Sequence, residues 1–128
     1  MRFIVMVKAP AAFEAGAMPS PELVEKMGAF NAELVKAGAL LGAEGLHPSA
    51  KGVRINFAGA KPTIIDGPFT ESKELVSGFW LLELKSLAEA VEWLQRAPFE
   101  NGEEIEIRRI FEEADFIEAM QSPKGSLK

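Results

Sequence analysis

The stretch GFWLLEL, residues 78–84, decides the fold, because it is apolar on both of its alternating faces. Its two sets of side chains are Phe79 with Leu81, and Trp80 with Leu82 and Leu84. A strand that is apolar on both faces belongs in the middle of a sheet whose two faces are both covered. The run FIVMV, residues 3–7, has the same character. We therefore expect two central strands.

Two amphipathic helices are predicted beside these strands. The first begins at Ser20, a good capping residue, with Pro21 where no amide partner is needed, and it ends at Gly38. Its apolar stripe is Leu23, Met27, Phe30, Leu34 and Val35. The second helix opens with a capping box formed by Ser86 and Glu89. Its apolar stripe is Leu87, Ala90, Val91 and Leu94.

Shorter runs account for the rest of the chain. Residues 9–19 are small, contain Gly and Pro, and are predicted as a surface loop. The further predicted elements are strands at 39–43, 53–57, 63–65 and 104–110 and a short helix at 112–120. The first three of these strands are expected to form a small antiparallel unit.

The resulting order is strand, helix, hairpin region, strand, helix, strand, which predicts an α+β, ferredoxin-like βαββαβ fold with an antiparallel sheet. Two helices cover only one face of such a sheet. We expect an identical sheet from a second subunit to cover the other face, so the predicted state is a homodimer. The length fits one domain over residues 1–118, followed by a flexible C-terminal tail at 119–128.

The composition excludes several classes of function. The 128 residues include no cysteine and one histidine, so neither disulfides nor a multi-histidine metal cage is expected. The formal net charge is -5, and residues 100–118 carry eight carboxylates, which disfavours nucleic acid and anionic membranes as partners. The sequence has no glycine-rich phosphate loop, so we expect no nucleotide cofactor. No apolar run has the length of a membrane span, and a cytoplasmic location is expected.

Asp66 is the first candidate for chemistry. It directly follows Ile64 and Ile65, so we expect its carboxylate to be partly desolvated, with a raised pKa, and to serve as a general base. The alternative is that Asp66 and Gly67 simply form a turn whose exit is fixed by Pro68.

His47 is the second candidate. Its imidazole is the side chain whose ordinary pKa suits proton transfer near neutral pH, so it is the expected partner of Asp66 or Glu44 in an acid-base pair. The alternative is an idle, solvated histidine in a Gly- and Pro-bearing turn. Three further side chains are candidate ligand-binding groups: Glu44, Arg54 and Lys73. Arg54 or Lys73 would neutralise an acidic or cyclic ligand, although each is equally explained by pairing or by solvation.

Several ordered motifs resemble one known family. They are EGL-PS at 44–49, DGPF-E-KE at 66–74, GFW at 78–80, EAG with MPS near the start, EA-EW in the second helix, and EIEIR followed by DF at the end. Together they resemble the YCII-related DGPF family over residues 1–118. The resemblance implies a dimeric α+β barrel, in which two ferredoxin-like sheets pack face to face.

The resemblance also implies two kinds of activity. For the wider YCII-related group, the resemblance implies a His-Asp pair in a cleft. One relative resembles a dehydrochlorinase that acts on a chlorinated aromatic. The first helix of this chain has no histidine, so only Asp66 transfers from that pattern, and His47 would act from a different loop. DGPF proteins also resemble partners of alternative sigma factors.

Three functional hypotheses follow. The chain is a small-molecule-binding protein or cofactor-independent enzyme that uses an acid-base carboxylate in a barrel cleft, or it is a non-catalytic accessory module of an alternative sigma factor. In a third interpretation, residues 66–74 serve folding or dimerisation alone.

Overall fold

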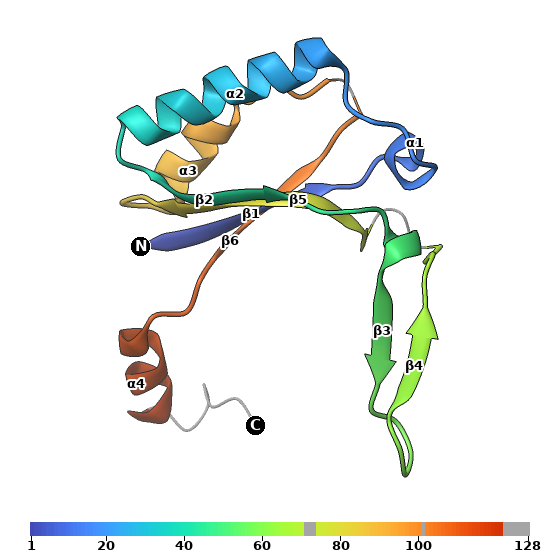
Figure 1. Cartoon of the computed structure of the whole chain (residues 1–128). Helices are drawn as coiled ribbons and strands as arrows, with labels where there is room; N and C mark the ends of the chain where they lie inside the picture. The colour runs from blue at the N-terminus through green and yellow to red at the C-terminus, as the bar shows by residue number, and fades with distance from the viewer. Residues whose placement is uncertain (71–73, 101, 122–128) are drawn as a thin grey trace.

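A four-stranded antiparallel sheet forms the centre of the computed structural model, which describes residues 1–70, 74–100 and 102–121 (Figure 1). Its strands, in spatial order, are β2 (Leu40–Gly45), β5 (Val76–Glu83), β1 (Arg2–Lys8) and β6 (Ile105–Arg109). This order and the alternation of strands with helices are those of a ferredoxin-like α+β fold, as the sequence predicts.

The two strands predicted as central are central. β1 pairs with β5 on one side and with β6 on the other, and every pairing in the sheet is antiparallel. Val5 lies opposite Trp80, and Ile4 lies opposite Leu81. Because side chains alternate along a strand, the first pair faces the helices and the second faces the opposite side of the sheet.

Helix α2 (Pro21–Lys36) is built as its sequence predicts. The Ser20 hydroxyl accepts a hydrogen bond from the backbone N–H of Leu23 at 3.1 Å, and Gly38 takes a left-handed φ of 71° just past the helix end. Phe30 and Leu34 are buried. Val35 was expected on the same stripe and is 61% exposed, because it lies about 100° further round the helix than Leu34.

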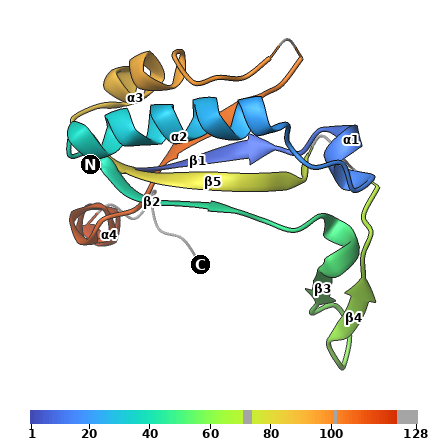
Figure 2. The same ribbon diagram turned by 45° about the horizontal axis from the view of Figure 1, so that its top comes forward.

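Helix α3 (Leu87–Leu94) is capped by Ser86, whose hydroxyl accepts from the backbone N–H of Glu89 at 3.1 Å. The Glu89 carboxylate accepts from the N–H of Lys85 at 2.9 Å, one residue before the position that a regular capping box uses. Ala90 and Leu94 are buried against the sheet, whereas the other two stripe residues, Leu87 and Val91, are exposed. Both α2 and α3 lie on the same face of the sheet (Figures 1 and 2).

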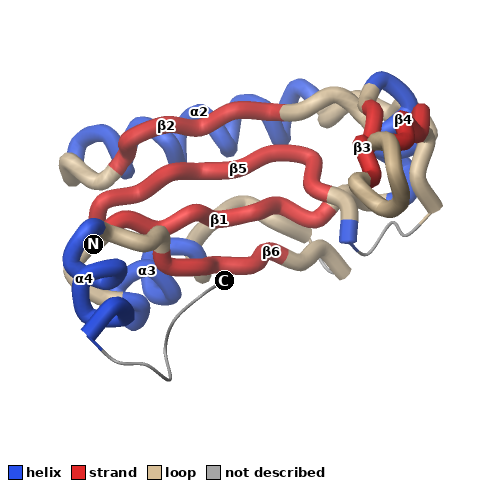
Figure 3. The backbone as a smooth tube through the Cα atoms, turned by 90° about the horizontal axis from the view of Figure 1, so that it is seen from below, coloured by secondary structure: helices blue, strands red, loops and turns tan. Residues whose placement is uncertain are grey.

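The core lies between this face and the two helices. Most of its buried side chains come from β1, β5, α2 and α3, and they include Phe3, Val5, Phe30, Leu34, Trp80 and Leu82. The opposite face of the sheet carries Ile4, Met6, Phe79 and Leu81, which are only partly buried. Figure 3, seen from below, shows the four strands of this face with neither α2 nor α3 in front of them. We call it the open face.

The hairpin of β3 (Val53–Asn56) and β4 (Thr63–Asp66) forms a separate two-stranded sheet. The sequence predicts these two strands and their pairing but wrongly groups residues 39–43 with them, because β2 pairs with β5 in the main sheet. The hairpin projects from the body on the side of the open face (Figures 1 and 2). Its apolar side chains are exposed: Val53, Ile55, Ile64 and Ile65, with Phe57 just beyond β3.

Two short elements flank the base of the hairpin. Residues 9–19, expected as a loop throughout, contain a one-turn helix, α1 (Ala11–Glu14), and the 3-10 turn η1 (Ser49–Lys51) precedes β3. Such a turn is too short for periodicity to reveal it.

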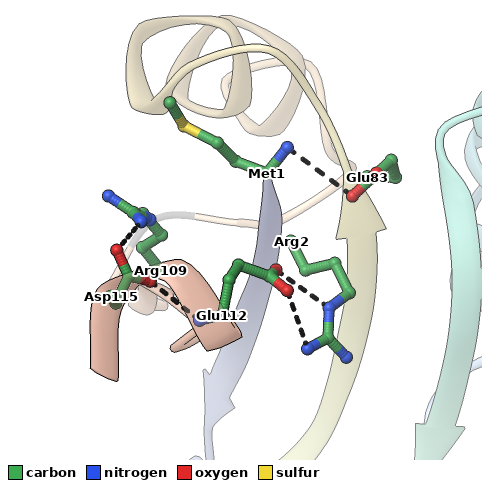
Figure 4. A network of polar contacts seen from close by, with 6 residues as sticks. All are labelled: Met1, Arg2, Glu83, Arg109, Glu112 and Asp115. Atoms are coloured by element: carbon green, nitrogen blue, oxygen red, sulfur yellow. Dashed lines mark hydrogen bonds and ion pairs between the residues drawn. The ribbon is translucent and has the colours of Figure 1, made fainter. Parts of the chain in front are cut away.

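The last helix, α4 (Glu113–Gln121), also lies on the open-face side and extends three residues into the segment expected as a tail. The Arg2 guanidinium donates to both carboxylate oxygens of Glu112, at 3.0 and 3.2 Å, and Arg109 pairs with Asp115 (Figure 4). The hydrogen bonds from Arg2 lower the pKa of Glu112. The pKa of Asp115 is lowered first by the backbone N–H of Glu112 and then by Arg109.

Within the described ranges, no helix is both long and apolar enough to cross a bilayer.

Candidate functional site

Three of the sequence motifs meet at one hydrogen-bonded junction at the base of the hairpin. Glu14, at the end of α1, accepts from the backbone N–H of Ser49 at 2.9 Å and also contacts the Ser49 hydroxyl. That hydroxyl oxygen accepts from the backbone N–H of Phe69 at 3.0 Å. The junction therefore ties together segments that lie 35 and 20 residues apart in the chain.

Position 67 of this junction requires a glycine, because there is no room for a side chain. A Cβ atom there would lie 1.7 Å from the carbonyl oxygen of Ser49, far inside any van der Waals contact. The N–H of Gly67 donates to the carbonyl oxygen of Gly52 at 3.0 Å, so the two ends of the hairpin are joined directly. The Gly67–Pro68 peptide bond is cis. The DGPF motif thus has a structural role at the base of the hairpin, which is the alternative that the sequence leaves open beside catalysis.

Arg54, one of the candidate binding residues, lies on β3 with its guanidinium 3.8 Å from the centre of the Phe69 ring. This cation-π contact joins the hairpin to the DGPF motif. Lys73, proposed as a second cationic ligand-binding group, lies outside the described residues.

Asp66 and His47 are both exposed. Asp66 ends β4, paired in register with Val53, and its carboxylate is exposed rather than partly desolvated as expected. His47 lies in the loop between β2 and η1, two residues before Ser49. Among the described residues, no hydrogen bond or ion pair joins the Asp66 and His47 side chains.

An open groove of about 770 Å³ lies between α1, α2 and one end of the main sheet. Aromatic and aliphatic side chains dominate its lining: Phe13, Met18, Leu23, Val24, Met27, Leu46, Trp80 and Phe99. Trp80 packs edge-on against Phe30 and Phe99, with ring centres 5.8 and 5.9 Å apart. Such a concave apolar site with few polar groups is the usual form of a small-molecule pocket.

Four polar residues belong to the described lining of this groove: Asn31, Glu44, Ser77 and Glu103. Glu44 is therefore the one candidate from the sequence in this lining, while Asp66, His47 and Arg54 are absent from it. Because Glu44 lies opposite Phe79 in the sheet, its carboxylate is directed toward the open-face side rather than toward Trp80. No group of three or more metal-ligating side chains occurs in the described parts of the chain.

The junction and the groove are connected through α1. Ala12 and Phe13 of α1 line the groove, and the next residue, Glu14, is the one bonded to Ser49. The contact between Glu14 and Ser49 therefore fixes one wall of the groove.

Local sequence patterns predict neither this wall nor the role of Asn31. Glu14 belongs to the EAG motif in the segment expected as a loop, and nothing near it in the sequence indicates Ser49 as its partner. Asn31 directly follows Phe30 in a predicted helix, where a single amide carries no signal of its own. Its hydrogen bond from Trp80 spans 49 residues, a distance that no local pattern encodes.

Comparison with known proteins places the fold in context. The YCII-related domain family matches residues 1–114. The chain belongs to this family. An uncharacterised protein of Rhizobium meliloti (strain 1021) is 30% identical over 71 residues, which make up 56% of this chain and 57% of that protein. The chain thus spans little more than half the length of this curated relative.

One solved structure to which this chain is similar is 5-chloro-2-hydroxyhydroquinone dehydrochlorinase from Burkholderia phenoliruptrix, in complex with 2,5-dihydroxybenzoquinone. It is 16% identical to this YCII-related chain, with a TM-score of 0.41, and the match covers 90% of this chain and 99% of that one.

Proposed function

We propose that this YCII-related protein binds a small, apolar ring compound in the groove between α1, α2 and the sheet. The observation that carries the proposal is the groove itself, whose volume of about 770 Å³ and aromatic lining suit such a ligand. The lining places Trp80, Phe13 and Phe99 around one space. Aromatic rings of this kind contribute large apolar contact areas to binding.

The charge of the groove lining distinguishes between the two kinds of ligand expected from the sequence, an acidic compound and a cyclic one. Glu44 and Glu103 line it, and its described lining includes no Lys, Arg or His. Carboxylates disfavour an anionic ligand that lacks a cationic partner. A cyclic, uncharged ligand is therefore favoured over an acidic one.

The exposure of the predicted catalytic pair favours binding over catalysis within one chain. Asp66 and His47 are exposed and absent from the groove lining, so this chain alone offers neither as a contact for a ligand held there. The acid-base role of Asp66 with His47 stays a prediction.

Fluorescence titration with Nile red, a neutral and environment-sensitive dye, tests the proposal. Gly28 lines the groove on α2, and a Cβ added there would meet no atom within 4 Å. A Gly28→Leu variant should fill the groove and weaken dye binding about tenfold. The control is Ala32→Leu, an exposed position on the same helix that is absent from the lining. Equal dye binding by wild type and both variants would place the dye elsewhere and overturn the proposal.

We also propose that two copies pair through the open face. Ile4, Met6, Phe79 and Leu81 form an apolar strip there that α2 and α3 leave uncovered. Lys8 and Glu106, which share this face, already pair at 3.1 Å, so a second copy brings little uncompensated charge to it. A partner sheet stacked about 10 Å away would also meet the projecting hairpin, which is marginal when isolated.

The alternative of an accessory module for a sigma factor has less support. Its expected docking surface is the acidic segment 100–118, in which Glu112 and Asp115 already pair with Arg2 and Arg109. These internal pairs reduce the charge available to a basic partner.

A further inference from the structure

We infer that Asn31 is the hydrogen-bond donor that selects the ligand of the groove, and that the ligand is a neutral ring compound bearing a carbonyl-type oxygen. The inference rests on the proposed function and adds a specificity residue and a chemical class to it. It is carried by the contact between Asn31 and Trp80.

This contact fixes which way the Asn31 amide faces. The indole Nε1–H of Trp80 donates to the Oδ1 of Asn31 at 2.7 Å. An indole N–H can only donate, so it must meet the oxygen of the amide, not the nitrogen. Because Trp80 is 3% exposed and held between two other aromatic rings, it is a rigid anchor for the amide.

Because Oδ1 accepts from Trp80, the group of the amide that remains for a ligand is Nδ2, which is a donor. Within the described residues, no hydrogen bond to the protein reaches Nδ2, and Asn31 is one of the residues that line the groove. A donor held at the edge of an apolar site costs free energy unless it meets an acceptor.

The other polar side chains of the described lining have no spare donor. The Ser77 hydroxyl donates to the carbonyl oxygen of Val7 at 3.4 Å, and the Trp80 indole donates to Asn31. Glu44 and Glu103 in their ionised form only accept, and Glu103 already accepts from the N–H of Glu100 at 2.7 Å. Asn31 is thus the side chain through which the groove can recognise an acceptor oxygen.

This arrangement defines a class of ligand. The ligand must carry an acceptor oxygen, such as that of a ketone or quinone. Nδ2 is a donor, so it cannot form a hydrogen bond with a group that only donates. The oxygen must be uncharged, because the described lining includes the acidic residue Glu103 and no Lys, Arg or His that would pair with a carboxylate. The remainder of the ligand must be apolar to fit against Trp80 and Phe99.

Competition against bound Nile red tests the inference with three naphthalenes that carry their substituent at the same ring position. Acetylnaphthalene and isopropenylnaphthalene have nearly the same shape and differ in a C=O against a C=CH2 group, and naphthoate adds a negative charge. One neutral hydrogen bond predicts that the ketone displaces the dye at about fivefold lower concentration than the alkene. Naphthoate should be the weakest of the three.

The variant Asn31→Asp keeps an acceptor for the Trp80 indole and removes the donor, and an unchanged thermal melt confirms that it folds. In this variant at pH 8, the preference for the ketone should fall to about one. Equal displacement by ketone and alkene in the wild type, or a preference that survives in the variant, would overturn the inference while leaving the groove as a ligand site. Strongest displacement by naphthoate would overturn the neutral class. Failure of the dye and all three compounds to bind would instead remove the proposed function itself.

Discussion

The Glu14 carboxylate accepts a hydrogen bond from the backbone N–H of Ser49 at 2.9 Å, across 35 residues of sequence. This single side chain joins α1 to the turn that precedes the hairpin. Because the neighbouring Phe13 lines the groove, the contact links the family motifs to the shape of the proposed ligand site.

Replacement of Glu14 should loosen this wall. Glu14→Ala leaves the Ser49 N–H without its partner, which should destabilise the fold by about 1–3 kcal/mol. Glu14→Gln retains an acceptor oxygen and should cost clearly less. Hydrogen exchange at the Ser49 amide, followed by NMR, should be fast in the alanine variant and slow in the glutamine variant. Equal protection in both would mean that another group holds this turn.

Gly67→Ala should be strongly destabilising, because its Cβ would lie 1.7 Å from the Ser49 carbonyl oxygen. Forced overpacking of this kind costs about 1–3 kcal/mol and lowers the melting temperature by several degrees. Gly52→Ala is the matched control, since its Cβ would meet the same oxygen at an ordinary 3.5 Å. A Gly67→Ala melt as high as that of the control would contradict the proposed packing role.

Acidification should release α4 before the core unfolds. The pKa values of Glu112 and Asp115 are lowered from 4.5 and 3.8 by their partners, so both carboxylates stabilise the folded state above those values. That stabilisation is lost as the pH falls through the lowered pKa values. Protection factors at the α4 amides should therefore fall below about pH 4, whereas the tryptophan fluorescence of the core stays unchanged. A Glu112→Gln variant should lose the part of this pH dependence that arises from Arg2. Simultaneous loss of α4 and the core would count against a local release.

Leu81→Glu should convert the proposed dimer into a monomer, because it places a charge in the middle of the open face. Light scattering after size-exclusion chromatography gives the mass directly. Val35→Glu, at a 61% exposed position on α2, is a control of the same chemistry on the opposite side of the sheet and should leave the mass unchanged. A wild-type monomer at micromolar concentration would refute the dimer without any variant.

Asp66→Asn and His47→Gln should leave Nile red binding within about twofold of wild type and stability within about 0.5 kcal/mol, as is usual for exposed positions. The reason is that neither side chain lines the groove. Isothermal calorimetry on the purified variants gives both affinity and stoichiometry. A large loss of dye binding in either variant would mean that the replaced side chain contributes to the ligand site, and it would strengthen the acid-base hypothesis.

Local patterns in the sequence are sufficient to predict most of the framework. The two-faced apolar strand around Trp80 identifies the centre of the sheet, and Ser20, Ser86 and Gly38 mark helix ends through short-range hydrogen bonds and backbone conformation. Val35 shows the limit of such patterns, because an apolar residue at nearly the right spacing is still exposed when the helix turns it away from the sheet.

The site depends on contacts that local patterns do not contain. Gly67 is needed because of a carbonyl oxygen at Ser49, and Asn31 matters because of an indole at position 80. The type of each residue is visible in the sequence, but its partner is set by the assembled fold. A turn at Asp66 and Gly67 is predictable from the residue types of the DGPF motif, whereas the packing of Gly67 against Ser49 and of the Phe69 ring against Arg54 is not.

The hydrogen bond from Gly67 to Gly52 has an architectural consequence. The chain leaves the body and returns to it at neighbouring points, so residues 53–66 form a closed insert between the second and third strands of the ferredoxin-like unit. Such an insert can be lengthened, shortened or exchanged for another without disturbing the order of the main sheet. The hairpin is thus a natural grafting position, where a new recognition element can be added to an unchanged scaffold.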